Sequence, residues 1–253
     1  MTNRTIQGDA LKQLMIQALE SYPLCEFFLS RYVQKMTDID MQRDEAFHVS
    51  VKRILLIDTH LIPHFEALIS SALQALGLSK EKLKKSSEFN FECYNPTNLE
   101  SFLGVLRAAI FLHEKGYTDL KLLKRASCAD ILCRLHGRWV CVEVKTLTYD
   151  RRGGRGLWLG DQVADKLKDI LPSARRQLSK ARADYACQET ILAVVINWLE
   201  QSAVLQQEDY QEIVDKLESS TPNLNQLEGV DHIVFITYFG QAYPFSRTQL
   251  ASS

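Results

Sequence analysis

The chain has 253 residues, a formal net charge of −1, 46% hydrophobic residues and 24% charged residues. These values are ordinary for a folded globular protein, and they exclude a fibrous chain, a low-complexity chain and a globally basic, histone-like chain. The length suits one large domain or a core with an added subdomain, since domains usually hold roughly 100 to 200 residues.

The N-terminal segment, residues 1–13, lacks the basic stretch followed by an apolar run that a secretory signal requires. The longest apolar runs are too short to span a bilayer. We therefore expect a cytoplasmic protein with no membrane partner.

The six cysteines are scattered without a CxxC pair, so we expect buried thiols in a reducing compartment, without a disulfide framework or a zinc ribbon.

Charge is distributed unevenly along the chain. Residues 145–182 hold ten Lys or Arg against four Asp, whereas residues 200–231 hold eight acidic residues and one Lys. A net charge near zero can hide a polarised surface. We therefore expect one face of the protein to be basic.

The N-terminal third of the chain has the apolar spacing of helices. Residues 5–77 repeat apolar side chains every three or four positions, with a well-defined run at 65–76. The polar, lysine-rich segment 80–87 is the best candidate for a boundary. We expect an all-helical subdomain in residues 1–85 and a second domain in residues 86–253.

The second domain is expected to alternate strands and helices. A helix is predicted over 99–115, with Asn98 or Thr97 as its cap, Glu100 in its first turn and Gly116 at its end. The predicted strands cover 119–123, 129–135, 138–147, 190–198 and 232–238, and the predicted helices between them cover 160–170, 173–185 and 210–218. This order is typical of an α/β fold.

The hairpin formed by the second and third predicted strands turns at residues 136–137. Pairing outward from this turn sets Asp130 directly opposite Glu143. Because side chains alternate between faces, both acids and Lys145 share one face, and an apolar set covers the other. A one-residue slip would mix the two sets, which supports this register. The apolar set is Ile131, Cys133, Leu135, Val140, Val142 and Val144.

The acidic face of this hairpin suggests a metal site. Two opposed carboxylates about 5 Å apart repel each other by roughly 3 kcal/mol at an effective dielectric near 20. Lys145 neutralises one of the two charges but not both. Hard oxygen ligands with residual negative charge suit Mg²⁺ or Mn²⁺, which can activate water for phosphodiester hydrolysis. The alternative is a solvated strand face that carries a surface pair of Glu143 and Lys145.

These residues resemble a known signature. Asp130, followed after twelve residues by Glu143, Val144 and Lys145, is similar to the PD-(D/E)xK motif of the restriction-endonuclease-like nuclease superfamily. The resemblance spans about residues 99–198. It implies an α/β fold with an α-β-β-β-α-β core, in which helices flank a mixed central sheet.

The resemblance also implies roles for individual residues. Asp130, Glu143 and the Val144 carbonyl would be ligands of Mg²⁺ or Mn²⁺. Lys145 would be the catalytic lysine, and Glu100 would be an auxiliary acid on the preceding helix.

Two positions depart from the pattern. Ala129 stands where the signature has Pro. Gln177 matches a glutamine of RecB-like nucleases, but Ala181 stands where those proteins carry Tyr four residues later. The resemblance therefore assigns the superfamily and no subfamily.

Basic residues that follow the motif are candidates for contact with nucleic acid. The segment 149–158 combines arginines, glycines and aromatics, and a flexible solvated loop is its alternative. The helix that follows carries further cations, with a charged solvent face as the alternative. Trp139 and Arg134 share the face of Glu143 and are candidates for stacking on a base, with packing as the alternative. The expected nucleic-acid-binding residues are Arg151, Arg152, Arg155, Arg175, Arg176, Gln177 and Lys180.

The sequence favours a metal-dependent endonuclease with DNA as its substrate, although RNA stays open. Because each chain would carry one active site, cleavage of both strands of a duplex favours a homodimer or two sequential nicks. The alternative is a catalytically inactive module that has kept the nuclease fold and binds nucleic acid or a protein partner, because a fold does not by itself determine function.

Overall fold

The computed structural model describes residues 2–42, 51–87, 89–124, 128–147, 160–196, 229–236 and 242–246. The chain folds as two compact units, Met1–Leu106 and Arg107–Ser253. Each unit is described by itself. The division lies inside a helix and about twenty residues later than the boundary we expected at residue 85.

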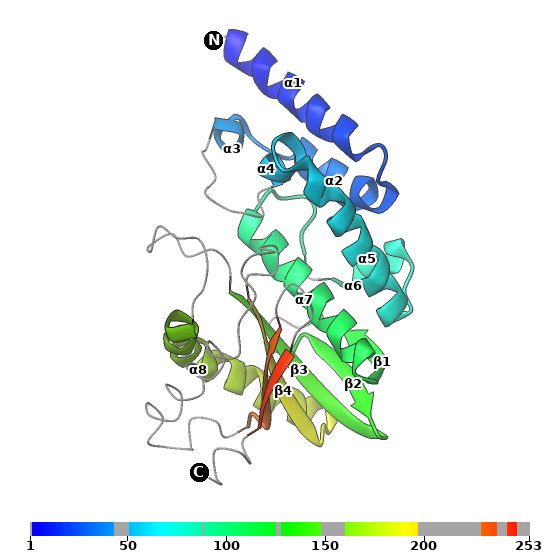
Figure 1. Cartoon of the computed structure of the whole chain (residues 1–253), viewed down its shortest axis with the longest axis vertical. Helices are drawn as coiled ribbons and strands as arrows, with labels where there is room; N and C mark the ends of the chain where they lie inside the picture. The colour runs from blue at the N-terminus through cyan, green and yellow to red at the C-terminus, as the bar shows by residue number, and fades with distance from the viewer. Residues whose placement is uncertain are drawn as a thin grey trace. The chain divides into compact units, whose positions relative to one another are not determined.

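The first unit is all-helical, as predicted (Figure 1). Its α5 helix ends where Gly77 adopts a left-handed φ of 60°, a conformation that glycine adopts readily. The helices are α1 (Thr2–Leu19), α2 (Pro23–Gln34), α3 (Asp38–Gln42), α4 (Val51–Leu56), the 3-10 helix η1 (Thr59–Leu61), α5 (Ile62–Leu76), α6 (Lys80–Ser86) and the first part of α7 (Pro96–Glu114).

The lysine-rich segment that we expected to mark the boundary is helix α6. The side chain of Ser79 accepts a hydrogen bond from the backbone N–H of Lys82 at 3.3 Å and so caps the helix. Leu83 is fully buried. The lysines therefore form the solvent-facing side of an ordered helix, and their polarity does not indicate a linker.

Aromatic side chains fill much of the core of the first unit. The ring centroids of Phe28 and Phe91 are 5.4 Å apart, and those of Phe89 and Phe102 are 5.2 Å apart in a stacked arrangement. Because these rings come from α2, from the segment after α6 and from α7, they tie three parts of the unit together.

The second unit contains a six-stranded sheet in the order β1-β2-β3-β4-β5-β6. β3 pairs in parallel with β4, and β4 pairs in parallel with β5, whereas the other neighbours are antiparallel. With α7 before β1 and α8 (Gly160–Tyr185) between β3 and β4, the order α-β-β-β-α-β is as predicted, and the α/β class is confirmed. The strands are β1 (Thr118–Leu122), β2 (Ile131–Leu135), β3 (Arg138–Leu147), β4 (Glu189–Ile196), β5 (His232–Ile236) and β6 (Ala242–Ser246).

Strand β6 was not expected from the sequence. It lies at the edge of the sheet and contains Pro244, a residue that a strand tolerates mainly at an edge and that weakens the strand pattern. The helix predicted over 210–218 lies outside the described residues.

The hairpin of β2 and β3 has the predicted turn and the predicted pairing from Leu135 with Arg138 to Ile131 with Val142. Both turn residues have positive φ, 49° at His136 and 81° at Gly137. This is the backbone of a type I′ turn, whose twist matches that of paired strands.

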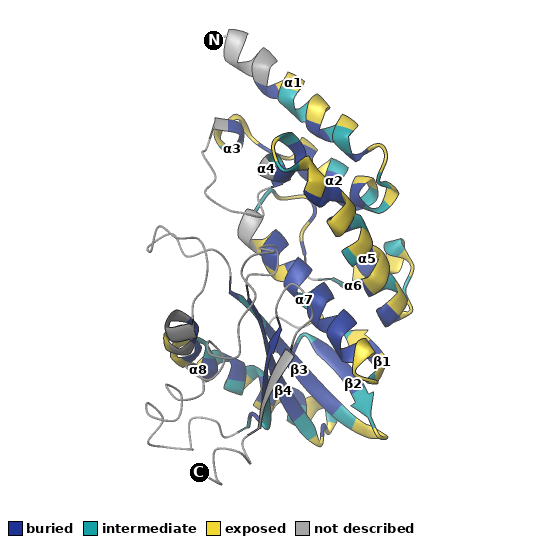
Figure 2. Cartoon of the chain, in the orientation of Figure 1, coloured by how far each residue is buried: buried dark blue, intermediate teal, exposed yellow. Residues whose placement is uncertain are grey.

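Away from its turn, the hairpin has buried residues on both faces of the sheet, whereas the residues next to the turn are half-buried or exposed (Figure 2). The predicted core face is confirmed, since Ile131, Cys133, Val140 and Val142 have no exposed surface. The opposite face, which carries Glu143, is covered by α8, as expected when a crossover helix joins parallel strands.

Helix α8 is continuous over 26 residues, whereas we expected two helices that break near Pro172. Its apolar side chains recur at three- and four-residue steps on both sides of the proline, so one stripe faces the sheet throughout. Burial of this stripe offsets the lost backbone hydrogen bond, which costs about 3 kcal/mol in a helix interior. The stripe consists of Val163, Leu167, Leu171, Ala174, Leu178 and Ala181.

In the described part of the chain, no single helix is both long enough and apolar enough to cross a membrane. The segments Thr59–Leu76 and Lys80–Ser86 meet those criteria only as a pair, and they are bent by 83° at their break.

Candidate functional site

Glu143 and Lys145 form an ion pair on β3. Two residues apart on a strand, they point to the same face, toward α8. The Lys145 Nζ atom lies 2.6 Å from Glu143 Oε1, and the side chains are 26% and 1% exposed. A carboxylate buried to this degree is costly unless a cation and hydrogen bonds compensate it, and Lys145 supplies that cation.

Gln177 on α8 is the second partner of the Lys145 ammonium group. Its Oε1 atom accepts a hydrogen bond from Lys145 Nζ at 3.0 Å. The neighbouring Ala174 and Leu178 belong to the buried stripe of α8, and this fixes the direction in which Gln177 projects. Lys145 is therefore held by β3 and α8 together.

Asp130 does not pair with Glu143 in the way that we predicted. The regular ladder ends at the pair of Ile131 and Val142, and the Asp130 N–H donates to the same Val142 carbonyl at 3.0 Å. Two successive residues of one strand thus face a single residue of the other, as in a β-bulge. The Asp130 side chain still contacts β3, since its Oδ2 atom accepts the Val144 N–H at 2.7 Å.

The oxygens near this site suit a hard cation in their chemistry. Asp130, Glu143 and Lys145 together carry one net negative charge, and the Val144 carbonyl is a further oxygen donor. Carboxylate and carbonyl oxygens are the ligands that Mg²⁺ prefers. Among the described residues, no group of three or more His, Cys, Asp or Glu side chains is arranged to hold a metal ion. A metal would thus depend on two carboxylates, a main-chain carbonyl and water.

Glu100 lies on α7 in the first unit, and its side chain is 2% exposed. Burial raises the pKa of this carboxyl group from 4.5 to about 8. Its Oε2 atom makes no hydrogen bond to the part of the chain that the structure describes. Glu100 is therefore mainly protonated at neutral pH, and its expected role as an auxiliary acid stays a prediction.

The expected nucleic-acid contacts divide into two groups. Arg151, Arg152 and Arg155 lie outside the described residues. On α8, Arg176 and Lys180 are exposed and four residues apart, so they share one side of the helix. The other two predicted residues of this helix are half-buried: Arg175, and Gln177, which contacts Lys145.

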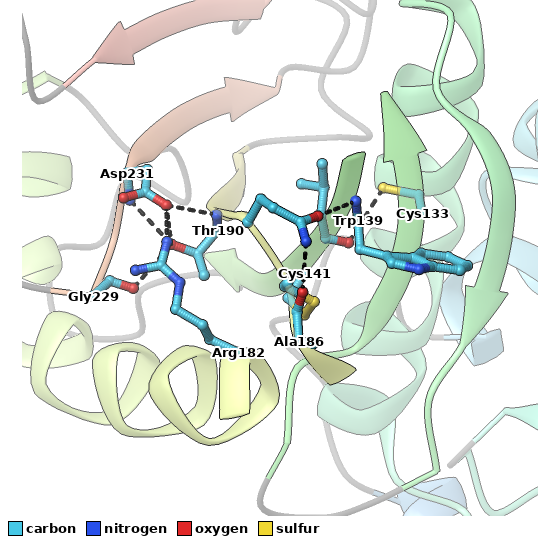
Figure 3. The surroundings of a disulfide bond; sticks show 11 residues. Cys133, Trp139, Cys141, Arg182, Ala186, Thr190, Gly229 and Asp231 are labelled. Carbon is cyan, nitrogen blue, oxygen red and sulfur yellow. Dashed lines mark hydrogen bonds and ion pairs between the residues drawn. A yellow bond between two sulfur atoms is a disulfide. The ribbon is translucent and has the colours of Figure 1, made fainter. Parts of the chain in front are cut away.

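Our expectation that every cysteine remains a thiol is wrong for two of the six. Cys141 of β3 and Cys187, between α8 and β4, form a disulfide with the sulfur atoms 2.03 Å apart (Figure 3). Their 46-residue separation hides this pairing in the sequence. It becomes evident only in the sheet, where Cys141 pairs with Thr190, three residues after Cys187. The remaining thiols are Cys25, Cys93, Cys128 and Cys133.

A polar cluster beside the disulfide joins α8 to the starts of two strands, and no motif in the sequence predicts it (Figure 3). The Asp231 carboxylate is bound by the Arg182 guanidinium, by the Thr190 N–H at 2.8 Å and by the Thr190 hydroxyl at 3.0 Å. The single proton of this hydroxyl can be donated either to Asp231 or to the Gly229 carbonyl, which lies 2.9 Å away. These bonds fix the end of α8 against the starts of β4 and β5.

Comparisons with protein-family models, with curated proteins and with solved structures find no match to this chain. No relative therefore tests the roles expected for Asp130, Glu143 and Lys145. The resemblance rests on these residues and on the order of the elements that carry them.

Proposed function

We propose that this protein is a metal-dependent nuclease with a PD-(D/E)xK type of site on a restriction-endonuclease-like core. The observation that carries the proposal is the position of the Lys145 ammonium between Glu143 Oε1, at 2.6 Å, and Gln177 Oε1, at 3.0 Å. The order α-β-β-β-α-β around β3 supports it, because this order accompanies the motif in the superfamily that the sequence resembles.

The proposed ion is Mg²⁺ or Mn²⁺. Asp130, Glu143 and the Val144 carbonyl would hold it, and their oxygen chemistry fits it. When bound, such an ion polarises a phosphodiester oxygen and lowers the pKa of a coordinated water.

The chain's own groups would orient the reaction. The Lys145 ammonium would stabilise negative charge that develops on the phosphate, and Gln177 fixes its direction through α8. The hydrogen bond from the Val144 N–H to Asp130 Oδ2 fixes the β3 backbone beside the Val144 carbonyl. Helix α8 keeps bulk water away from Glu143, which strengthens electrostatic interactions there.

DNA is the proposed substrate class, with RNA as the other outcome of a substrate panel. Exposed cations on α8, Arg176 and Lys180, suit a phosphate backbone. A homodimer would place two such sites on a duplex.

A second candidate function is a non-cleaving module that binds nucleic acid or a protein. One observation favours it: Glu143 is almost fully buried and already paired with Lys145, which is also the arrangement of a structural ion pair.

Cleavage assays with a matched control separate these functions. The purified protein is incubated with Mg²⁺ or Mn²⁺ and labelled duplex, branched and single-stranded DNA, and with RNA. We expect the parent to cut and Lys145→Ala to be at least about 100-fold slower. The control Lys166→Ala, which changes a half-buried lysine of α8 paired with Asp169, should cut like the parent. A parent that cuts nothing, or a Lys145→Ala variant that cuts equally well, contradicts the proposal.

Calorimetric titration with Mn²⁺ provides a readout without cleavage. A nuclease site should bind the ion, and Asp130→Asn and Glu143→Gln should each weaken that binding by about tenfold or more. Binding that is absent, or that is equal in all three proteins, supports the non-cleaving module.

A further inference from the structure

Trp139 and two cations form a compact group on the hairpin, which we call the Trp139 stack: Trp139, Arg134 and Lys121. Arg134 of β2 pairs with Trp139 of β3, and its guanidinium carbon lies 4.1 Å from the centroid of the indole ring. The Nζ atom of Lys121, on β1, lies 5.7 Å from the same centroid. Two cations from neighbouring strands therefore meet at one aromatic ring.

The indole ring itself is already engaged. Trp139 packs against the core cluster between the sheet and α8. Its backbone is bound on both sides by Gln188, with the Trp139 N–H donating to Oε1 at 2.7 Å and the Gln188 N–H donating to the Trp139 carbonyl at 2.9 Å (Figure 3). A base could stack on the ring only by displacing Arg134. This arrangement disfavours the base-stacking interpretation of Trp139.

Arg134 is instead arranged to bind an anion. Its guanidinium carbon lies over the Trp139 ring, and a guanidinium presents several N–H donors in one plane that fit a phosphate. The Nε atom is buried, so the two terminal nitrogens are the donors for an anion. The side chain is 42% exposed, and the closest acidic contact, from Nε to Asp119 Oδ2, is 3.7 Å. That distance is longer than a hydrogen bond. Among the described residues, the stack thus carries two positive charges and has one acidic contact, with Asp119.

The position of the stack relates it to the proposed nuclease site. Trp139 precedes Glu143 by four residues on β3, and even spacing puts both on the α8 face of the sheet. At about 3.3 Å per residue, the two positions are about 13 Å apart along the strand. A nucleic-acid strand bound at Glu143 is long enough to reach the stack.

We propose that Arg134, which lies over the Trp139 ring and is accompanied by Lys121, binds a phosphate of the nucleic acid on which the proposed nuclease acts. The contact recognises the backbone and not the base, because the ring is covered by the arginine. This inference rests on the proposed function and adds a sequence-independent binding subsite to it.

The test measures binding without cleavage. Fluorescence anisotropy follows labelled DNA duplexes of two unrelated sequences in EDTA, over a range of salt concentrations. We expect Arg134→Gln and Lys121→Gln each to weaken binding by about three- to tenfold, equally for both sequences. Each should also lower the slope of log K against log salt by about one. Lys121→Gln changes an exposed side chain, so it keeps the test valid if Arg134→Gln disturbs the fold.

The matched control is Arg138→Gln. Arg138 lies on the same hairpin, is more exposed than Arg134, is paired with Glu189 at 3.2 Å, and precedes Trp139 by one residue, on the opposite face. It should bind DNA like the parent. Unchanged affinity and salt slope in both test variants would overturn the inference, as would a loss that differs between the two sequences. Displacement of the DNA by polyglutamate at equal charge concentration would point to an acidic protein partner and would also overturn it.

The two proposals fail separately. If the parent cleaves DNA but Arg134→Gln and Lys121→Gln bind normally, only the phosphate subsite is wrong. If binding depends on both residues but no substrate is cleaved with Mg²⁺ or Mn²⁺, the nuclease proposal is wrong and the binding surface stands.

Discussion

The Lys145 ammonium lies 2.6 Å from the carboxylate of Glu143, which is buried on the α8 face of the central sheet. Removing a cation from a buried pair leaves the carboxylate with its desolvation cost and without the attraction. We expect Lys145→Ala to lower the free energy of unfolding by about 3 kcal/mol, the low end for buried pairs because Lys145 is partly exposed. Urea denaturation measures this change.

A double variant checks that the cause is the loss of the ion pair. Glu143→Gln combined with Lys145→Met removes both charges and should be closer to the parent in stability than Lys145→Ala. The control Lys168→Ala breaks an exposed pair with Asp165 and should cost less than about 1 kcal/mol. If Lys145→Ala is no less stable than this control, the ion pair does not stabilise the fold. Because Lys145→Ala is expected to be less stable, its activity is measured well below its melting temperature.

Gln177 is expected to act through Lys145. Gln177→Leu removes the oxygen that accepts the ammonium proton at 3.0 Å, so the lysine loses its fixed direction. If the nuclease proposal is right, kcat should fall by about tenfold, an effect typical of residues that orient a catalytic group, with KM within about twofold. Steady-state cleavage kinetics measure both constants. Arg176→Gln, one residue earlier and exposed, should instead raise KM. The reverse pattern would contradict the positioning role.

The hairpin shows what the sequence predicts well. Its pairing follows from a two-residue alternation and from a turn that needs positive φ, and both signals lie within seventeen residues of the printed sequence, from Ala129 to Lys145. The same signals do not predict the bulge at Asp130, because a bulge depends on which N–H reaches the Val142 carbonyl. The predicted register is thus right from Leu135 to Ile131, whereas the direct opposition of Asp130 and Glu143 is wrong. The metal site itself stays a prediction.

Contacts between distant segments were predicted least well. The Cys141–Cys187 disulfide and the Arg182–Asp231 ion pair depend on how β4 lies beside β3 and β5, and no local pattern encodes that. Helix α8 was also mispredicted from local signals. Pro172 favours a break, but burial of the apolar stripe keeps the helix continuous. Gln177 was singled out through the family resemblance, and only the folded structure brings it to Lys145.

Glu100 should make stability depend on pH. Its pKa is about 8 in the folded protein and near 4.5 when the carboxyl is solvated. Between these values the folded state binds a proton that the unfolded state has lost, so the contribution of Glu100 to stability is largest below pH 4.5 and falls as the pH rises toward 8. The expected slope from this group is about −1.4 kcal/mol per pH unit.

The variant Glu100→Gln isolates this contribution. Urea denaturation from pH 5 to 9 should show a flatter profile than that of the parent, with the difference concentrated below pH 8. Glu114→Gln, an exposed carboxylate at the end of the same helix, serves as the control and should keep the parent profile. Equal slopes for parent and Glu100→Gln would show that Glu100 ionises normally.

The disulfide should stabilise the second unit. For a loop of 46 residues, chain entropy predicts about 4 kcal/mol. We expect Cys187→Ala to lower the free energy of unfolding by an amount approaching that value, and dithiothreitol to lower it in the parent but not in the variant. Thiol titration of the unfolded parent without reductant should find four thiols. A count of six would show that the disulfide does not form.

Glu66 provides the N-terminal cap of α2 from a different helix. The residue that precedes α2, Tyr22, makes no side-chain cap. The Glu66 carboxylate on α5 instead accepts the Leu24 N–H at 3.0 Å and the Cys25 N–H at 2.8 Å. Negative charge at a helix N-terminus also interacts favourably with the helix dipole. The cap therefore joins two helices that are about forty residues apart in the sequence.

Glu66→Ala should lower the free energy of unfolding by about 2 kcal/mol, because two part-buried N–H groups lose a charged acceptor. Glu66→Gln retains one oxygen and should cost about half as much. Glu26→Gln removes an exposed carboxylate from the first turn of the same helix and should change stability by less than about 0.5 kcal/mol. Urea denaturation of the three variants ranks them. If Glu66→Ala changes the free energy of unfolding as little as Glu26→Gln does, water binds the N–H groups at the start of α2 equally well. The contact with α5 then contributes no net stability.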